Sequence, residues 1–244
     1  MLPTLEARGG AQLLFADPPY NLGIDYGNGT AADKLPPEKY REWLNRWVGL
    51  AARSLVDDGA MWVVCNWEWS HHYRLAMEAA GLHLRNVVVW YETFGVNCTG
   101  KFNRTSRPLL YYCKHPTRRV FNAEAVSRPS DRQLKYKDKR AAPGGKVLDD
   151  VWMDIPRVCG TFKERVQWAP TQLPVALVTR VVAACSNKGD LVIDPFSGSG
   201  TTGIACLDLG RRYIGIECEG EYCTLSHKRL ARHQQHKRAC IDVV

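Results

Sequence analysis

A strand-like segment that runs directly into a glycine turn and a helix-like segment constrains this 244-residue chain most strongly. Residues 191–202 read LVIDPFSGSGTT, an apolar run followed by a turn that contains Gly198 and Gly200. Glycine lets a backbone turn sharply and lie close to a ligand, and the first turn of a helix offers N–H groups that lack intrahelical partners. The segment therefore predicts a βα unit of an α/β fold with a nucleotide-type cofactor bound at the turn.

The identity of that cofactor depends on two acids. Glu217 ends the next apolar segment, seventeen residues after Gly200, where a carboxylate can bind both hydroxyls of a ribose. Gly198, Gly200 and Gly203 also have the spacing of a nicotinamide dinucleotide turn, so a dehydrogenase is an alternative. Asp194 favours S-adenosylmethionine instead, because a carboxylate attracts its positively charged methionine end and repels a pyrophosphate.

The rest of the chain alternates short apolar runs with helical patterns, which predicts an α/β fold with a mostly parallel sheet. Strands are expected at residues 11–16, 59–65, 86–91, 108–113, 190–196 and 212–217, and helices at 37–55, 70–80, 174–186, 201–209 and 219–233. The glycine-rich loop 21–36 lies directly after a candidate catalytic turn, and we expect it to close over a bound substrate.

That turn is Asp17-Pro18-Pro19-Tyr20, which follows the first predicted strand. The prolines fix φ and lack N–H groups, so the carbonyls can act as acceptors. A carboxylate and a rigid carbonyl that accept both hydrogens of an exocyclic base amine would localise its lone pair and make it nucleophilic. Tyr20 can stack on the base, worth roughly 1–3 kcal/mol, once the base has left the duplex. A plain proline turn is the alternative, and the position at a strand end favours catalysis.

A basic segment separates the two motifs. The chain carries a net charge of +8, and residues 114–146 hold ten Lys or Arg against three acids. This concentration favours a phosphate-contacting surface over an ordinary solvated loop. The candidate DNA-binding residues are Arg118, Arg119, Arg128, Arg132, Lys135, Lys137, Lys139 and Arg140.

Asp17-Pro18-Pro19-Tyr20-Asn21 early in the chain and residues 194–202 (DPFSGSGTT) late in the chain together resemble the amino-group DNA methyltransferases of bacteria and phages. The catalytic motif comes first and the cofactor motif last, which is the order of the circularly permuted beta class of N6-adenine/N4-cytosine type. Residues 170–174 (PTQLP) and 211–217 (RRYIGIE) are also similar to family stretches. The family commonly has histidine before Pro-Thr-Gln, where this chain has Ala169.

The resemblance implies a Rossmann-like class I S-adenosylmethionine-dependent methyltransferase sheet with a small target-recognition insert. Residues 1–113 would form the catalytic part, 114–150 the basic recognition insert, and 151–244 the cofactor-binding part. Asp17 and the Pro18 carbonyl would hold the target amine of double-stranded DNA, within a catalytic turn completed by Pro19 and Tyr20. The residues implied in S-adenosylmethionine binding are Asp17, Thr171, Gln172, Asp194, Phe196, Ser197, Gly198, Gly200, Thr201, Thr202 and Glu217.

Aspartate at the first motif position is the usual adenine form in this family, so the resemblance favours the N6 amine of adenine as the target. The N4 amine of cytosine is the near alternative, an RNA target a more distant one, and an inactive DNA-binding module a different class. No metal is expected, and a homodimer or a restriction endonuclease partner stays open. The chain has no apolar run as long as a membrane span, so a cytoplasmic location is the expectation.

Overall fold

A seven-stranded mixed sheet forms the centre of the computed structural model, which describes residues 9–92 and 97–241. Its strands are β1 (Ala11–Ala16), β2 (Leu55–Val64), β3 (His83–Tyr91), β4 (Ser106–Cys113), β7 (Val151–Trp152), β8 (Leu191–Asp194) and β9 (Arg212–Gly215). The strand order is β7-β3-β4-β2-β1-β8-β9, and β4 runs antiparallel to both of its neighbours while the other pairs are parallel. The α/β prediction with a mostly parallel sheet is confirmed.

Strands from opposite ends of the chain lie side by side at the middle of this sheet. β1 pairs in parallel with β8, with Leu13 opposite Val192 and Leu14 opposite Ile193. Since the carboxyl ends of parallel strands meet at one edge of a sheet, the turn that follows β1 and the turn that follows β8 emerge next to each other. The register thus joins two motifs that are 177 residues apart in the sequence.

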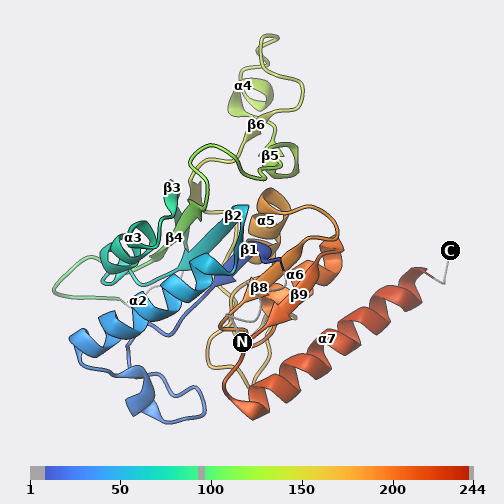
Figure 1. Ribbon diagram of the computed structural model, residues 1–244. Helices are drawn as coiled ribbons and strands as arrows, with labels where there is room; N and C mark the ends of the chain where they lie inside the picture. The colour runs from blue at the N-terminus through green and yellow to red at the C-terminus, as the bar shows by residue number, and fades with distance from the viewer. Residues whose placement is uncertain (1–8, 93–96, 242–244) are drawn as a thin grey trace.

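Helices cover both faces of the sheet (Figure 1). On one face, α2 (Pro37–Arg53) and α3 (Ser70–Ala79) bury their apolar sides in a cluster with Leu14, Met61 and Ile193. On the other face, α5 (Val175–Cys185) and α6 (Thr201–Leu209) pack over Leu13 and Phe15. The last helix, α7 (Gly220–Ile241), packs against α6 near its start and then extends away from the sheet (Figure 1).

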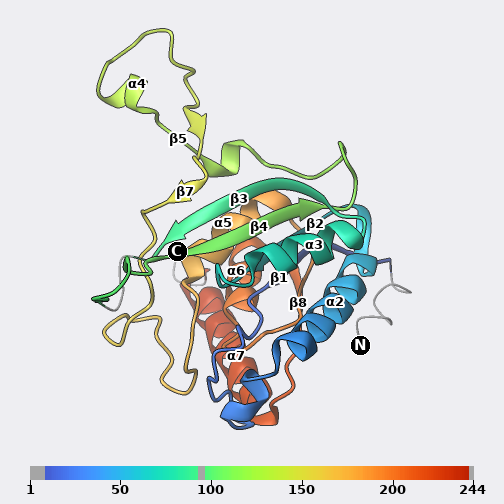
Figure 2. The same cartoon turned by 90° about the vertical axis from the view of Figure 1, so that its left-hand side faces the viewer.

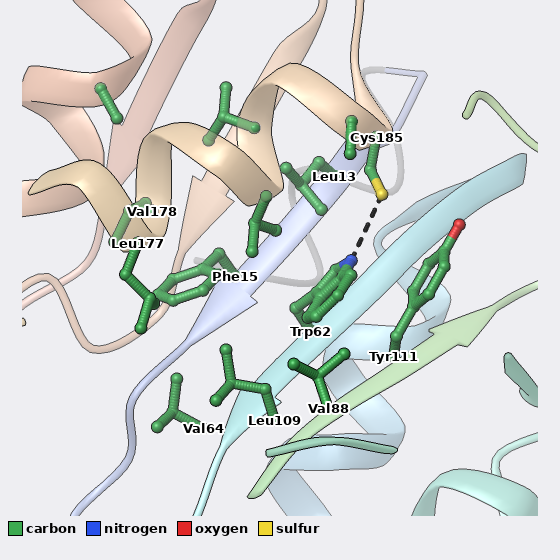
Figure 3. Close-up of a cluster of buried hydrophobic side chains, with 14 of the residues drawn as sticks. Leu13, Phe15, Trp62, Val64, Val88, Leu109, Tyr111, Leu177, Val178 and Cys185 are labelled. Atoms are coloured by element: carbon green, nitrogen blue, oxygen red, sulfur yellow. Dashed lines mark hydrogen bonds between the residues drawn. The ribbon is translucent and has the colours of Figure 1, made fainter. Parts of the chain in front are cut away.

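Aromatic side chains fill the core under α5 (Figure 3). Trp62 stacks on Tyr111 from the neighbouring strand, with ring centroids 4.6 Å apart and planes 12° apart. The Trp62 indole Nε1–H donates to Cys185 Sγ at 3.3 Å. This bond satisfies a buried indole donor that would otherwise oppose burial, so α5 is held on the sheet by both packing and a polar contact.

Several boundaries differ from the predicted ones. The helix predicted over residues 37–55 ends at Arg53, because the buried Leu55 already begins β2. Pro174 caps α5 instead of lying in its first turn. The strand predicted over 190–196 ends at Asp194, since Pro195 has no N–H for a ladder. α7 continues to Ile241, well beyond the predicted end at residue 233. Its outer turns are polar and lack the apolar periodicity that would have marked this extension in the sequence.

The basic insert, residues 114–150, projects from the body of the molecule (Figures 1 and 2). It contains η2 (Glu124–Val126), β5 (Ser127–Arg128), α4 (Asp131–Leu134) and β6 (Lys146–Val147), with β5 and β6 paired antiparallel. Its base is fixed to the end of α5, where Asn122 Nδ2 donates to the carbonyls of Ala183 at 3.0 Å and Ser186 at 2.8 Å. The basic insert is therefore a small arm whose root is anchored to α5.

No helix in residues 9–92 or 97–241 is long and apolar enough to cross a membrane. The outermost residues of the predicted catalytic and cofactor-binding parts, 1–8 and 242–244, lie outside the described ranges.

Candidate functional site

The Asp17-Pro18-Pro19-Tyr20 turn is fixed by hydrogen bonds from its own residues and from α2. The Tyr20 hydroxyl donates to Asp17 Oδ1, and the ring is 7% exposed. The Tyr40 hydroxyl of α2 donates to the Pro19 carbonyl at 2.6 Å. Tyr40 thus holds the Pro19 carbonyl and ties the turn to α2.

The glycine turn is built around a buried carboxylate. Asp194 ends β8 and is 4% exposed, and its Oδ2 accepts a hydrogen bond from the Thr202 hydroxyl at 2.6 Å. Its Oδ1 accepts from the Phe196 backbone N–H at 3.0 Å. Burial is the main reason that the pKa of Asp194 is raised to about 7; the negative charges of Asp17 and Glu217 also raise it, whereas these two hydrogen bonds lower it.

Glu217 lies just beyond β9 and closes the turn from the other side. Its Oε2 accepts a hydrogen bond from the Gly198 N–H at 2.8 Å, and its Oε1 accepts one from the Cys218 N–H at 2.8 Å. Gly198 has a φ of 47°, which a side chain would oppose, so the glycine permits this close approach of the turn to the acid.

Gly200 and Gly203 serve packing within the fold. A Cβ on Gly200, whose φ is 76°, would lie 3.2 Å from the Ser226 Cβ of α7. A Cβ on Gly203 would lie 2.7 Å from Leu230 and 2.8 Å from the Tyr213 ring. The two glycines thus let α6 lie close to α7 and β9, and Gly200 does not line the cavity described next.

Both turns open into one cavity of about 700 Å³ at the edge where β1 and β8 end. Its wall includes Tyr26 and Asp33 of the loop that follows the catalytic turn. The predicted site residues that line it are Asp17, Pro18, Pro19, Tyr20, Thr171, Gln172, Asp194, Phe196, Ser197, Gly198, Thr201, Thr202 and Glu217. The fold therefore brings together every predicted catalytic residue and every predicted cofactor residue except Gly200.

The Pro-Thr-Gln segment contributes in a different way from the turns. The Gln172 amide donates to the Glu164 carbonyl at 2.8 Å and accepts from the Val166 N–H at 2.9 Å. Both polar ends of that side chain thus hold the preceding loop in place. Thr171 itself lies on the wall of the main cavity, as does Tyr26 of the loop after the catalytic turn.

That loop, residues 21–36, is organised by one buried acid. Asp33 is 3% exposed and accepts hydrogen bonds from the N–H groups of Asn21 at 2.8 Å, Leu22 at 3.1 Å and Ile24 at 3.0 Å. Because three backbone donors converge on one carboxylate, the loop has a defined shape and forms a wall of the cavity. Whether it closes further over a ligand stays a prediction.

A second cavity of about 430 Å³ shares Asp17 with the first. Its lining includes Glu92, Arg107, Arg157 and Arg165, which the motif search did not assign to the site. Glu92 directly follows the apolar strand β3, and Arg107 lies near the start of the apolar strand β4. An isolated charged residue at the end of an apolar strand is the signal that could have marked them.

None of the predicted DNA-binding residues lines either cavity. All eight belong to the basic insert, whose part with α4 and β5 projects from the body (Figure 2). Four of them form ion pairs within the arm: Arg128 with Asp149, Arg132 and Arg140 with Asp138, and Lys135 with Asp131. Exposed pairs of this kind contribute little stability and leave the positive surplus of the arm unchanged. The arm therefore presents a basic surface beside the body of the molecule.

Metal-ligand geometry is not evident in residues 9–92 and 97–241, where no group of three or more His, Cys, Asp or Glu side chains converges. The acids of the main cavity are instead distributed around it. The arrangement suits an organic ligand that carries positive charge and hydroxyl groups.

Comparisons with known proteins agree with this geometry. A family model described as DNA methylase matches residues 11–228. The type II methyltransferase M.HpaI of Haemophilus parainfluenzae is 33% identical over 219 residues, which cover 89% of this chain and 67% of the relative. The DNA adenine methyltransferase YhdJ of Escherichia coli is 33% identical over 226 residues, covering 89% of this chain and 75% of the relative.

Among solved structures, the M1.HpyAVI complex with SAM is similar, with a TM-score of 0.67 and 23% sequence identity. The match covers 94% of this chain and 93% of that one. It confirms the predicted class I, Rossmann-like fold and corresponds to the seven-stranded sheet with one antiparallel strand described above.

Proposed function

This chain is a member of the N6/N4 amino-group DNA methyltransferase family, and we propose that it transfers a methyl group from S-adenosylmethionine to the N6 amine of adenine in a specific DNA sequence. The observation that carries the proposal is the convergence of the Asp17-Pro18-Pro19-Tyr20 turn and the glycine turn on one cavity. Asp17 lies on that cavity and on the second one, so it stands between two places where reactants can meet.

The residues of the main cavity fit S-adenosylmethionine in size and charge. A volume of about 700 Å³ is in the range of small-molecule sites, which are roughly 300–1,000 Å³. Glu217 beyond β9 would accept hydrogen bonds from the ribose hydroxyls, and Asp194 would attract the positively charged methionine end. When bound there, S-adenosylmethionine supplies an electrophilic methyl group on a positively charged sulfur for direct in-line transfer to the amine.

The protein's own contribution is to hold the target base and its amine in position for the transfer. Asp17 and the Pro18 carbonyl would accept the two hydrogens of the flipped base amine, which localises the nitrogen lone pair. The Arg107 guanidinium lies over one face of the Tyr20 ring, 5.3 Å from the ring centroid. The flipped base would stack on the opposite face of that ring. Orientation and fixed charges therefore carry the catalysis.

Adenine is favoured over cytosine by the aspartate at position 17 and by the similarity to a relative that is named a DNA adenine methyltransferase. The N4 amine of cytosine is the second candidate, because the matched family covers both amines. Modification-sensitive sequencing of DNA from cells that express the gene distinguishes them. We expect N6-methyladenine within one sequence context, and N4-methylcytosine would refute the choice of adenine.

Double-stranded DNA is the proposed substrate, bound by the arm of residues 114–150 through its phosphates. In this interpretation, residues 1–113 catalyse, the arm recognises the target, and residues 151–244 bind the cofactor. An inactive DNA-binding module would need the same arm but no acids in the cavity, so the buried Asp194 and the Asp17–Tyr20 hydrogen bond support an enzyme.

A further inference from the structure

An ion pair between two strand ends lies beside the catalytic turn. Arg107 near the start of β4 is opposite Trp90 of β3, and Glu92 directly follows β3. Arg107 Nε donates to Glu92 Oε1 at 2.7 Å, and the two side chains are 19% and 9% exposed. Because both charges are largely buried and well aligned, this pair is costly to break from one side only.

The same guanidinium reaches the catalytic turn. Arg107 Nη1 donates to the Tyr20 hydroxyl at 3.2 Å, and that hydroxyl donates to Asp17 Oδ1. A continuous chain of hydrogen bonds therefore runs from Glu92 through Arg107 and Tyr20 to Asp17. It joins β4 to the turn after β1, although β2 lies between these two strands in the sheet.

The chain of hydrogen bonds places the Arg107 charge where it affects the ionisation of Asp17. The groups that act on Asp17 are Tyr20 from its own turn, Glu92 after β3 and Arg107 from β4. Asp17 in turn acts on Cys65 after β2, Asp194 at the end of β8 and Tyr26 from the adjoining loop. Arg157 lines both cavities with Asp17, and its Nε lies 3.8 Å from Glu92 Oε2. Burial raises the pKa of Asp17, and Glu92 raises it as well, whereas Arg107 lowers it. The Arg107 charge thus favours the ionised form of Asp17 that an amine donor requires.

We propose that Arg107 is a positioning residue for methyl transfer: held by Glu92, it fixes the Tyr20 hydroxyl on one oxygen of Asp17 and leaves the other oxygen for the target amine. The proposal rests on the methyltransferase function proposed above. It assigns a task to two charged residues that belong to neither the Asp-Pro-Pro-Tyr motif nor the glycine motif.

The test compares Arg107→Gln, which removes the charge, with Arg107→Lys, which keeps it but cannot bridge Glu92 and Tyr20 at once. Steady-state methyl transfer to DNA is measured from pH 5 to 9 with labelled S-adenosylmethionine. For Arg107→Gln we expect a kcat loss on the order of 100-fold with KM for the cofactor little changed. We also expect the acidic limb of kcat to move to higher pH by about one unit. Arg107→Lys should lose rate while its acidic limb stays near that of the wild type.

Arg180→Gln is a matched control. Arg180 also pairs with a carboxylate, Asp154, at 2.6 Å, and is 15% exposed. Its guanidinium lies 4.8 Å from the centroid of the Trp152 ring, as that of Arg107 lies 5.8 Å from the Trp90 ring. It lines neither cavity that contains Asp17, so its loss should leave kcat and the acidic limb unchanged. An Arg107→Gln enzyme with the pH profile of this control would overturn the proposal.

A charge exchange separates positioning from simple fold stability. The double variant Glu92→Arg with Arg107→Glu restores an ion pair between the strand ends but places a negative charge beside Tyr20 and Asp17. If the pair serves only stability, the exchange restores activity, which contradicts the proposal. We expect the double variant to melt close to the wild type and to remain as slow as Arg107→Gln.

A readout that does not need turnover keeps this inference separate from the proposed function. Carboxyl ¹³C-aspartate NMR titration, with Asp17 assigned through Asp17→Asn, reports the ionisation of Asp17 directly. We expect the pKa of Asp17 to be higher in Arg107→Gln than in the wild type. Wild-type protein that transfers no methyl group would refute the proposed function alone, whereas an unshifted Asp17 titration would refute the role of Arg107 alone.

Discussion

Replacing Thr202 with valine tests how the glycine turn uses its buried acid. The Thr202 hydroxyl donates to Asp194 Oδ2 at 2.6 Å, and both residues are almost fully buried. Valine has nearly the same shape but no donor. The substitution therefore removes one charge-assisted hydrogen bond from Asp194 while the bond from the Phe196 N–H remains.

The expected size follows from the value of that bond. A hydrogen bond to a charged group contributes about 1.5–3 kcal/mol, which corresponds to roughly one to two pKa units at 1.36 kcal/mol each. The pKa of Asp194 is raised to about 7 in the native protein, and the variant would raise it further, to about 8 to 9. Because an acid with a higher pKa is less ionised at a given pH, the carboxylate fraction at pH 7.5 would fall by about 3- to 25-fold.

Isothermal titration with S-adenosylhomocysteine, which keeps the ammonium of the methionine end, measures the consequence. We expect the affinity of Thr202→Val to fall by the same factor at pH 7.5 and to return toward the wild-type value as the pH rises above 9. Thr202→Ser, which keeps the hydroxyl, should bind like the wild type. An affinity ratio between valine variant and wild type that does not change with pH would refute the role given to Asp194.

Three further outcomes follow from individual contacts. Gly203→Val places a side chain within 2.7 Å of Leu230 and 2.8 Å of Tyr213, so urea unfolding should show a loss of about 1–3 kcal/mol. Gly160→Val is the control, because a Cβ on Gly160 would have no atom within 4 Å, and it should not show this loss. Equal losses in the two variants would contradict the packing role of Gly203. Tyr40→Phe leaves the Pro19 carbonyl without its 2.6 Å hydrogen bond; we expect a lower kcat with cofactor affinity retained, and an unchanged kcat would show that the turn needs no support from α2. Arg118→Glu with Arg119→Glu should weaken DNA binding and reduce the slope of log affinity against log salt by about 0.9 per lost phosphate contact, whereas an unchanged slope would exclude them from the interface.

The sequence indicated the fold and the two turns because both rest on local signals. Apolar runs that end at proline or glycine mark strand ends, and the alternation with helical periodicity indicates the α/β class. The meeting of the two turns is not local, since it depends on β1 pairing with β8. The family resemblance implied only that residues of both turns bind the cofactor, and the β1–β8 register supplies the physical basis for their meeting.

Side-chain networks across the sheet could not be predicted in this way. Glu92 and Arg107 meet because β3 and β4 pair antiparallel in one particular register, which short-range patterns do not specify. The packing role of Gly203 could not be predicted for a similar reason. Its spacing from Gly198 and Gly200 allowed a dinucleotide turn, whereas the structure shows that the absent side chain makes room for Leu230 and Tyr213.

The most direct test of the central claim is mass spectrometry of nucleosides from duplex DNA after incubation with the purified protein and S-adenosylmethionine. We expect N6-methyladenine with the wild-type protein and no methylated base with Asp17→Ala, which should still bind the cofactor at least in part. An Asp17→Ala protein with near-normal methyl transfer would contradict the assignment of the Asp-Pro-Pro-Tyr turn. Wild-type protein that binds S-adenosylmethionine but leaves every base unmodified would contradict the account as a whole.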